Sequence, residues 1–226
     1  MAKSNYDLGQ EVHKMLLGKG LENPIDWDIV TANFGEGGLT ALKYGAETLC
    51  YNLGLSTEDP STVGTPLRLA KMYRNELCWG LDYGNFPDTM LTPTQGHLDE
   101  MVLVRDIEVK SLCEHHFMPV LGRAHVAYIA NGSCLGLSKF NRIVEFFSRR
   151  PQLQERLCQQ IQHTLMHVLN TEDVAVIIDA EHFCVKFRGV EDSCSSTVTS
   201  CMGGRFRNQP EVRMELLALI QQGTKQ

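Results

Sequence analysis

The segment "SLCEHHFMP" places a thiol, a carboxylate and two imidazoles in a row, at Cys113, Glu114, His115 and His116. Thiolates and imidazoles bind zinc readily, and the Cys-x-x-His spacing of Cys113 and His116 allows both to reach one ion. A third ligand of this kind, Cys184, follows much later in "HFC". Two thiolates, one imidazole and an open fourth position are typical of a catalytic zinc site. The alternative is that both cysteines are small buried core residues. Spacing alone favours neither the zinc site nor core packing.

A second group of residues could bind an anion. Lys139 and Arg142 stand three positions apart at the start of a predicted helix that Ser138 can cap, so they share a face beside free backbone N–H groups. Arg68 and Lys71 form a similar pair on an earlier predicted helix. A pair of this kind, taken singly, is more often solvated charge on the surface than an anion-binding site.

The stretch "FCVKFRGV", residues 183–190, has the composition of a strand. Alternate residues of a strand face the same way, so Cys184, Lys186 and Arg188 would share one face. Glu155 stands one turn into another predicted helix, where its carboxylate could accept two N–H bonds from a purine edge or simply favour the positive helix start. Cations gathered near a possible metal in an acidic protein favour a polyanionic small substrate.

The bulk composition is that of a globular protein. The chain has 226 residues, of which 43% are hydrophobic and 21% charged, and its formal net charge is −6. The negative balance argues against broad binding of nucleic acid or anionic membranes. The eight cysteines are scattered, the N-terminus lacks the apolar core of a signal peptide, and no apolar run is long enough to span a bilayer. We therefore expect a cytoplasmic protein with reduced thiols.

Hydrophobic periodicity predicts a helical first third followed by strands and helices. Helices are predicted over 6–20, 39–55 and 61–81, with residues 20–38 as a loop or extended arm; Thr65 caps the third helix and Pro66 occupies its first position. The remaining predicted elements are strands at 100–112 and 123–132, helices at 139–150 and 151–170, strands at 174–180 and 183–190, and a helix at 210–222. This order predicts an α+β fold with helices on one face of an antiparallel sheet.

Five segments together resemble the GTP cyclohydrolase I family: "TPLRLAKMY", "SLCEHHFMP", "GLSKFNRIVEFFSRRPQLQERL", "HFCVKFRG" and "TSCMGGRF". Their order is highly specific, and the resemblance runs from about residue 53 to 206. It implies a T-fold, an antiparallel four-stranded sheet with two helices between its middle strands, as the catalytic domain at 96–226 after an N-terminal helical arm at 1–95. It also implies that the sheets of several subunits close into a barrel, giving a homodecamer of two pentameric rings with active sites at subunit interfaces.

The resemblance implies the family's reaction, in which GTP and water give formate and 7,8-dihydroneopterin triphosphate. It assigns zinc to Cys113, His116 and Cys184. In a regular strand Cys113 and His115 would face together, so the use of His116 implies an irregular backbone. Water activated by zinc attacks C8 of the guanine ring, the imidazole ring opens, formate leaves, and an Amadori-type rearrangement precedes ring closure.

The remaining roles carry over residue by residue. His115 and His182 are the implied proton carriers, because imidazole titrates near the working pH. Gln154 is implied to lie near the ribose or the activated water, and Glu155 to hold the N1 and 2-amino edge of guanine. The residues implied to bind the triphosphate are Ser138, Lys139, Arg142, Arg188, Arg68 and Lys71. Phe187, Cys194 and Cys201 depart from the family pattern.

Two other classes of function compete. Another T-fold enzyme is one: pterin synthases use three histidines for zinc, and the nitrile reductases of 7-deazaguanine synthesis use a cysteine nucleophile without catalytic zinc, so Cys184 argues against both. A non-catalytic zinc protein that binds a partner is the other, and the presence of both His115 and His182 argues against it. The sequence leaves open whether the product enters folate, biopterin or 7-deazaguanine synthesis.

Overall fold

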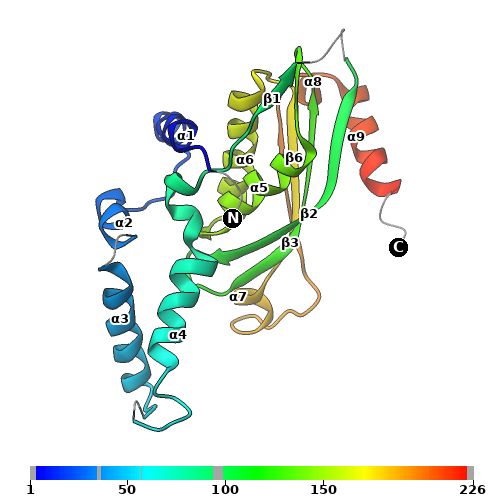
Figure 1. Ribbon diagram of the computed structural model, residues 1–226. Helices are drawn as coiled ribbons and strands as arrows, with labels where there is room; N and C mark the ends of the chain where they lie inside the picture. The colour runs from blue at the N-terminus through cyan, green and yellow to red at the C-terminus, as the bar shows by residue number, and fades with distance from the viewer. Residues whose placement is uncertain (1–3, 35–36, 57, 94–98, 223–226) are drawn as a thin grey trace.

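The computed structural model describes residues 4–34, 37–56, 58–93 and 99–222. A twisted sheet carries helices on both faces, and a pair of helices projects away from it (Figure 1). The α+β class predicted from the order of elements is confirmed. The expected domain boundary at 95/96 falls within 94–98, outside the described residues.

The main sheet contains five strands in the order β5-β2-β3-β6-β7. Their bounds are β2 Met101–Cys113, β3 Pro119–Ile129, β5 Pro151–Gln152, β6 Val174–His182 and β7 Thr197–Met202. Four of them pair antiparallel, and β5 adds a short parallel pairing to the end of β2. The β2–β3 register shifts at a β-bulge between Val104 and Ile107, where Asp106 has a φ of 56°. A separate two-stranded sheet pairs β1 (Leu91–Pro93) with β4 (Ser133–Leu135).

Both faces of the sheet are covered, so the expectation of helices on one face alone was wrong. Helices α5 (Leu137–Ser148) and α6 (Gln154–Leu169) lie between β3 and β6 in the chain and pack on one face, while α8 (Gly204–Asn208) and α9 (Pro210–Gln222) lie on the other (Figure 1). The alternation along β6 explains this, because Val176 and Ile178 belong to the core under α5 and α6, whereas Ile177 packs with Phe206 and Leu216. Two helices between the middle strands were expected and are found.

The first third of the chain is helical. It contains α1 (Tyr6–Gly18), α2 (Trp27–Asn33), α3 (Gly38–Asn52), α4 (Thr65–Lys71), a π-helical turn at Met72–Leu77, and 3-10 turns at Trp79–Leu81 and Tyr83–Asn85. α1 packs beside α6 through the fully buried Val12 and Leu16, whereas α3 and α4 lie side by side in the projecting arm (Figure 1). No helix in the described ranges has the length and apolar character needed to cross a membrane.

A buried polar network joins this helical part to the sheet domain. The Arg150 side chain is 0% exposed; its Nη1 donates to Glu22 Oε1 at 3.3 Å, and its Nη2 donates to the Gly80 carbonyl. Its guanidinium also lies 5.1 Å from the Tyr83 ring centroid and 4.8 Å from that of Phe146. The positive charge is therefore paired with the Glu22 carboxylate, as a buried ion requires.

Several predicted boundaries were wrong. Residues 183–190 form no strand; α7 (Phe183–Lys186) stands there instead, and the edge strand is β7. The reason is the lack of a partner, because β3 pairs with β6 only as far as Val120 opposite His182, and β7 pairs only from Ala180. The predicted loop at 20–38 contains α2, whose Asp26 accepts from the N–H groups of Asp28 and Ile29 as an N-cap.

The predicted helix starts were also displaced. Gly64, Gly136 and Leu153 occupy the N-cap positions of α4, α5 and α6, so Thr65 and Ser138 lie inside their helices and make no cap hydrogen bond. Pro151 belongs to β5 rather than to α6, because its carbonyl accepts from Asn23 Nδ2 and its strand pairs with the end of β2.

Candidate metal centre

The irregular backbone expected after Cys113 is present. β2 ends at Cys113, residues Glu114–His116 form a turn, and Phe117 has a φ of 54° before β3 begins. Two backbone hydrogen bonds close this loop: Cys113 N–H donates to Met118 O at 2.8 Å, and Phe117 N–H donates to Cys113 O at 2.9 Å. The turn breaks the strand alternation, so His116 can face the same point as Cys113.

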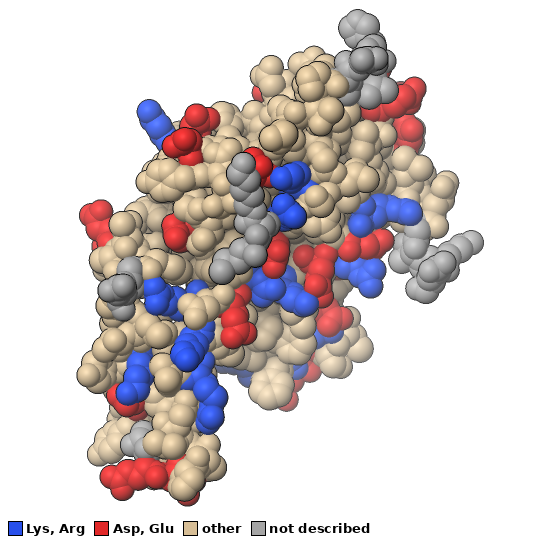
Figure 2. All heavy atoms as spheres, viewed as in Figure 1, with Lys and Arg blue, Asp and Glu red and all other residues tan. Residues whose placement is uncertain are grey.

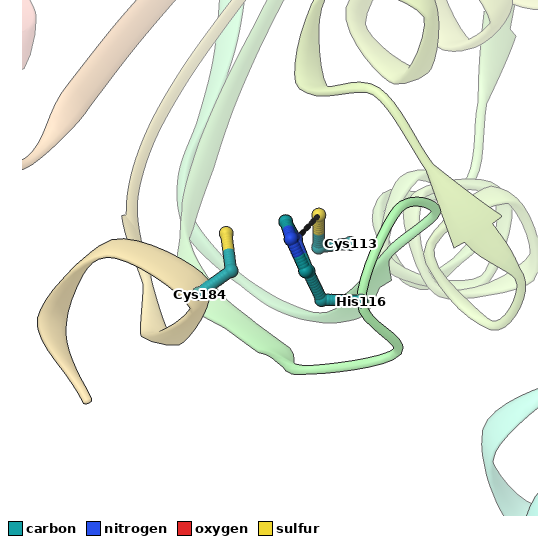
Figure 3. Close-up of side chains that lie close together, drawn as sticks. All are labelled: Cys113, His116 and Cys184. Atoms are coloured by element: carbon teal, nitrogen blue, oxygen red, sulfur yellow. Dashed lines mark hydrogen bonds between the residues drawn. The ribbon is translucent and has the colours of Figure 1, made fainter. Parts of the chain in front are cut away.

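Cys184 reaches that point from the other direction. It stands on α7, directly after β6, which pairs with β3 next to the turn. The ligand atoms of Cys113, His116 and Cys184 all lie within 4.8 Å of one another, and Cys113 Sγ is 3.8 Å from His116 Nδ1. Figure 3 shows the three side chains converging, with Cys184 from α7 and the other two from the β2–β3 loop. We call these three residues the Cys–His–Cys site.

The donor set fits a zinc ion. Tetrahedral zinc holds sulfur at about 2.3 Å and nitrogen at about 2.0–2.1 Å, which sets ligand atoms roughly 3.5–3.8 Å apart. The Cys113–His116 separation of 3.8 Å already matches, and closing the remaining distances requires only small rotations of the side chains. Within the described ranges the group contains three protein ligands, which leaves a fourth position for water or substrate.

Burial and a neighbouring thiol control the protonation of Cys184. Desolvation raises the pKa of its thiol, the hydrogen bond with Cys113 raises it further, and the Arg188 guanidinium opposes both. Two adjacent thiolates are therefore unfavourable without a cation between them. A divalent ion removes this cost, because it binds both sulfurs as thiolates.

His182 is oriented by Gln154, the first residue of α6. Gln154 Nε2 donates to the carbonyls of Ile178 at 3.0 Å and Thr197 at 2.8 Å, and these oxygens can only accept. Gln154 Oε1 therefore faces His182 Nε2, at 2.7 Å, and that ring nitrogen must carry the hydrogen. The Nδ1 atom is left for proton exchange. Burial lowers the pKa of His182, and the Glu155 carboxylate partly offsets this effect.

The metal-binding turn is held by a second residue of α6. Arg156 Nη1 donates to Glu114 Oε2 at 2.6 Å, and both side chains are only 18% exposed. Glu114 Oε1 also lies 3.9 Å from Nε2 of the exposed His115 imidazole. The first turn of α6 thus presents Gln154 to His182, Glu155 to solvent and Arg156 to the turn.

The predicted anion-binding residues lie in three places. Arg188 Nη1 is 3.3 Å from His116 Nε2, directly at the Cys–His–Cys site. Lys139 and Arg142 are half-buried on α5 beside the exposed Ser138, and Lys139 Nζ lies 4.0 Å from Asp88. Arg68 and Lys71 are exposed on α4, where Arg68 donates to the Ser61 carbonyl at 3.3 Å.

Basic side chains gather over the α4 part of the arm (Figure 2). Within the described ranges no hydrogen bond or ion pair joins Ser138, Lys139, Arg142, Arg68 or Lys71 to the Cys–His–Cys site. Lys186 does not share a strand face with Cys184; it forms an ion pair with Glu181 at 3.0 Å.

Of the two residues that hold the turn, Glu114 was expected from the sequence to support the cluster rather than to act in catalysis, and Arg156 was assigned no role. The signal for Glu114 was its position between two metal-binding types of residue, and Arg156 follows directly after Glu155. Nothing in their spacing indicated the ion pair, since the two residues stand 42 positions apart.

Comparison with known proteins gives one family. A family model described as GTP cyclohydrolase I matches residues 43–221. The chain is 48% identical over 207 residues to "GTP cyclohydrolase 1" of Aeromonas hydrophila subsp. hydrophila, covering 92% of this chain and 94% of the relative. It is 46% identical over 209 residues to "GTP cyclohydrolase 1" of Yersinia pestis, covering 92% and 94%. A solved structure of the archaeosine synthase QueF-Like in the apo form covers 49% of this chain and 97% of its own, at 16% identity and a TM-score of 0.40, too low to support an argument.

Proposed function

Because this chain belongs to the GTP cyclohydrolase I family and is an enzyme of that class, we propose that it opens the imidazole ring of GTP at C8, releases formate and forms 7,8-dihydroneopterin triphosphate. The observation that carries the proposal is that the Cys–His–Cys site lies beside His182, which is hydrogen-bonded to Gln154 at the start of α6. When bound there, zinc supplies Lewis-acid activation of the attacking water.

His182 and His115 carry the protons in this proposal. The Nδ1 atom of His182, whose Nε2 hydrogen is held by Gln154, accepts a proton from the attacking water and passes it to N7 of guanine as C8 is attacked. Gln154 acts as a positioning residue, since both ends of its amide are bonded within the protein. His115, whose side chain is 62% exposed beside Glu114, exchanges protons with solvent during the later hydrolysis and rearrangement steps.

Glu155 recognises the base. Its carboxylate is exposed at the first turn of α6, one residue after Gln154, where it can accept hydrogen bonds from N1–H and the 2-amino group of guanine. Adenine offers an unprotonated N1 and no 2-amino group, so the same carboxylate disfavours ATP. Arg188, Ser138, Lys139 and Arg142 bind the triphosphate, with Arg68 and Lys71 contributed by the arm of another subunit.

We further propose a homodecamer of two pentameric rings, with the active sites at the subunit interfaces. Two observations support it. Within the described part of the chain, β2 pairs on its outer side only through Leu112 and Cys113, and β7 has no outer partner, so most of both sheet edges is open. The arm helix α3 also leaves Leu42, Leu49 and Tyr51 at least 42% exposed. The thiols of the site also need a reducing compartment, and we propose the cytoplasm.

The test is an assay of the zinc-loaded protein with GTP that measures formate and, after oxidation, a fluorescent pterin. We expect both products in equal amounts, and their loss when a chelator removes the metal. Release of formate without formation of a pterin would show that the protein opens the ring but does not complete the rearrangement and ring closure. If neither product appears while zinc is bound at one per chain, the proposed reaction is wrong, and another purine substrate or a binding role replaces it. ATP serves as the matched substrate control.

A further inference from the structure

The eight cysteines have free thiols in this structure, and two of them form a pair outside the metal centre. Cys158 on α6 is 0% exposed, and Cys201 on β7 is partly exposed. Cys201 packs against the buried core cluster that contains Cys158. Neither residue binds the metal or touches His182, so the proposed reaction makes no use of them.

The register of the sheet explains why these thiols meet. Cys201 lies directly opposite Val176, whose side chain points into the core under α6, so Cys201 points toward α6 as well. Cys158 Sγ donates to the Val176 carbonyl at 3.4 Å, which brings it to the same position along the strands.

A second contact holds the same two elements in register. Gln154 stands one turn before Cys158 on the same face of α6, and Thr199 stands two residues before Cys201 on the same face of β7. Gln154 Nε2 donates to Thr199 Oγ1 at 3.2 Å. The helix and the strand are therefore bonded on one side of the thiol pair before any covalent bond forms.

The two thiols differ in reactivity. The neighbouring Cys158 thiol and the positive charge of Arg207 lower the pKa of Cys201, and burial opposes them. The neighbouring Cys201 thiol and burial raise the pKa of Cys158. Of the two, the partly exposed sulfur therefore loses its proton more readily, and the thiolate is the form that attacks an oxidant.

We propose that Cys158 and Cys201 are a thiol-oxidation site that forms a reversible disulfide between α6 and β7 in the presence of a peroxide. The Cys201 thiolate attacks one peroxide oxygen, the O–O bond breaks, and Cys201 becomes a sulfenic acid while hydroxide leaves. The Cys158 sulfur then attacks the Cys201 sulfur, and its proton leaves with the displaced hydroxide as water. Two thiols and one hydrogen peroxide give one disulfide and two waters.

The bond would form beside the catalytic residues without using them. Disulfide sulfurs stand about 2.05 Å apart, which is shorter than any hydrogen-bond contact between two thiols, so α6 and β7 must draw slightly together at this point. The cross-link also closes the chain from α6 through β6 and α7 to β7, which includes Cys184. We expect the oxidised protein to resist proteolysis in the exposed segment between α7 and β7 better than the reduced one.

The experiment treats the zinc-loaded full-length protein with hydrogen peroxide, blocks the remaining thiols with N-ethylmaleimide, and maps disulfides in a non-reducing digest by mass spectrometry. We expect a Cys158–Cys201 cross-linked peptide, a mass loss of about 2 Da per chain, and full reversal by dithiothreitol. Cys201→Ser and Cys158→Ser should each abolish the cross-link, whereas Cys194→Ser, at an exposed single thiol, should retain it.

Three outcomes would overturn the proposal. The first is Cys201 oxidised to sulfinic acid with no cross-link in a protein that keeps its zinc. The second is a cross-link that joins Cys113 and Cys184 instead. The third is a Cys158–Cys201 cross-link that forms equally fast in urea-unfolded chains, since the native geometry would then contribute nothing. If a serine variant fails to fold, the disulfide mapping of the unsubstituted protein still tests the proposal.

Discussion

Replacing Arg150 by methionine should destabilise this protein more than most single substitutions. Methionine keeps much of the apolar stem between Phe146 and Tyr83 but removes the guanidinium. The Glu22 carboxylate, 3% exposed, then remains buried without its cation, although Gln160 Nε2 still donates to it at 3.3 Å. Breaking a buried ion pair from one side costs about 3–5 kcal/mol. At this chain length that corresponds to a fall in Tm of roughly 6–20 °C.

The measurement is thermal and urea unfolding of the zinc-loaded variant, followed by circular dichroism. The matched control is Arg123→Met, which breaks an ion pair of 3.1 Å with Asp106 whose side chains are 68% and 44% exposed. Exposed pairs contribute about 1 kcal/mol or less, so the control should change Tm little. The double variant Arg150→Met/Glu22→Leu removes both buried charges and should recover a large part of the loss.

An equal fall in Tm in Arg150→Met and Arg123→Met would refute the reasoning, because the buried ion pair would then contribute no more to stability than a solvated one. A double variant less stable than Arg150→Met alone would refute it in another way, since Glu22 would be stabilising without its cation. The same variants also test whether the buried ion pair is coupled to the metal centre. Such coupling is expected because the Arg150 carbonyl accepts a hydrogen bond of 3.2 Å from Ser111 Oγ, and Ser111 stands two residues before Cys113.

Three further predictions concern the metal centre, the recognition of guanine and a histidine of α1. Cys184→Ser should lose zinc and formate release together, measured by metal analysis and the GTP assay; full activity without zinc would exclude the proposed metal chemistry. Glu155→Ala should keep zinc but lose about 10- to 100-fold of its preference for GTP over ATP in kcat/KM, since a charge-assisted hydrogen bond contributes about 1.5–3 kcal/mol; unchanged discrimination would remove Glu155 from base recognition. Burial lowers the pKa of His13 below 6.5, so the unfolded chain binds the proton more tightly. Stability should therefore be complete above pH 6.5 and decline as the pH falls below it, and His13→Phe should make Tm less dependent on pH in that range.

The sequence predicted the regular elements that periodicity controls. Strands β2, β3 and β6 were expected close to where they lie, because their β-branched residues alternate or run continuously between polar ends. The same reasoning failed at 183–190, where "FCVKFRGV" has a strand composition but no neighbouring strand to pair with. β7 was overlooked although "TVTS" begins with three consecutive β-branched residues.

The candidate site was likewise predicted only in part. Cys113 and His116 were indicated by local spacing, and Cys184 was a distant candidate of the right type that the resemblance to the family assigned to the metal. Gln154 was placed in the site by the same resemblance, but its contact with His182 across 28 positions could not be predicted, and neither could the contact of Arg150 with Glu22 across 128. "SRRPQ" resembles a solvated basic turn, and only the packing of the first helices against the sheet makes its second arginine a core residue.

The distance in the chain between the metal ligands also bears on how this protein is synthesised. Cys113 and His116 leave the ribosome as a two-ligand fragment, and Cys184 follows about 70 residues later, a delay of several seconds at ordinary translation rates. During that interval zinc can be held only weakly, and β3 must still await β6 as a partner. Tight metal uptake therefore reports that β6 and α7 have joined the sheet. Newly made chains should acquire zinc late, after β6 and α7 have been synthesised, so a shortage of zinc should accumulate full-length apoprotein rather than partly synthesised chains.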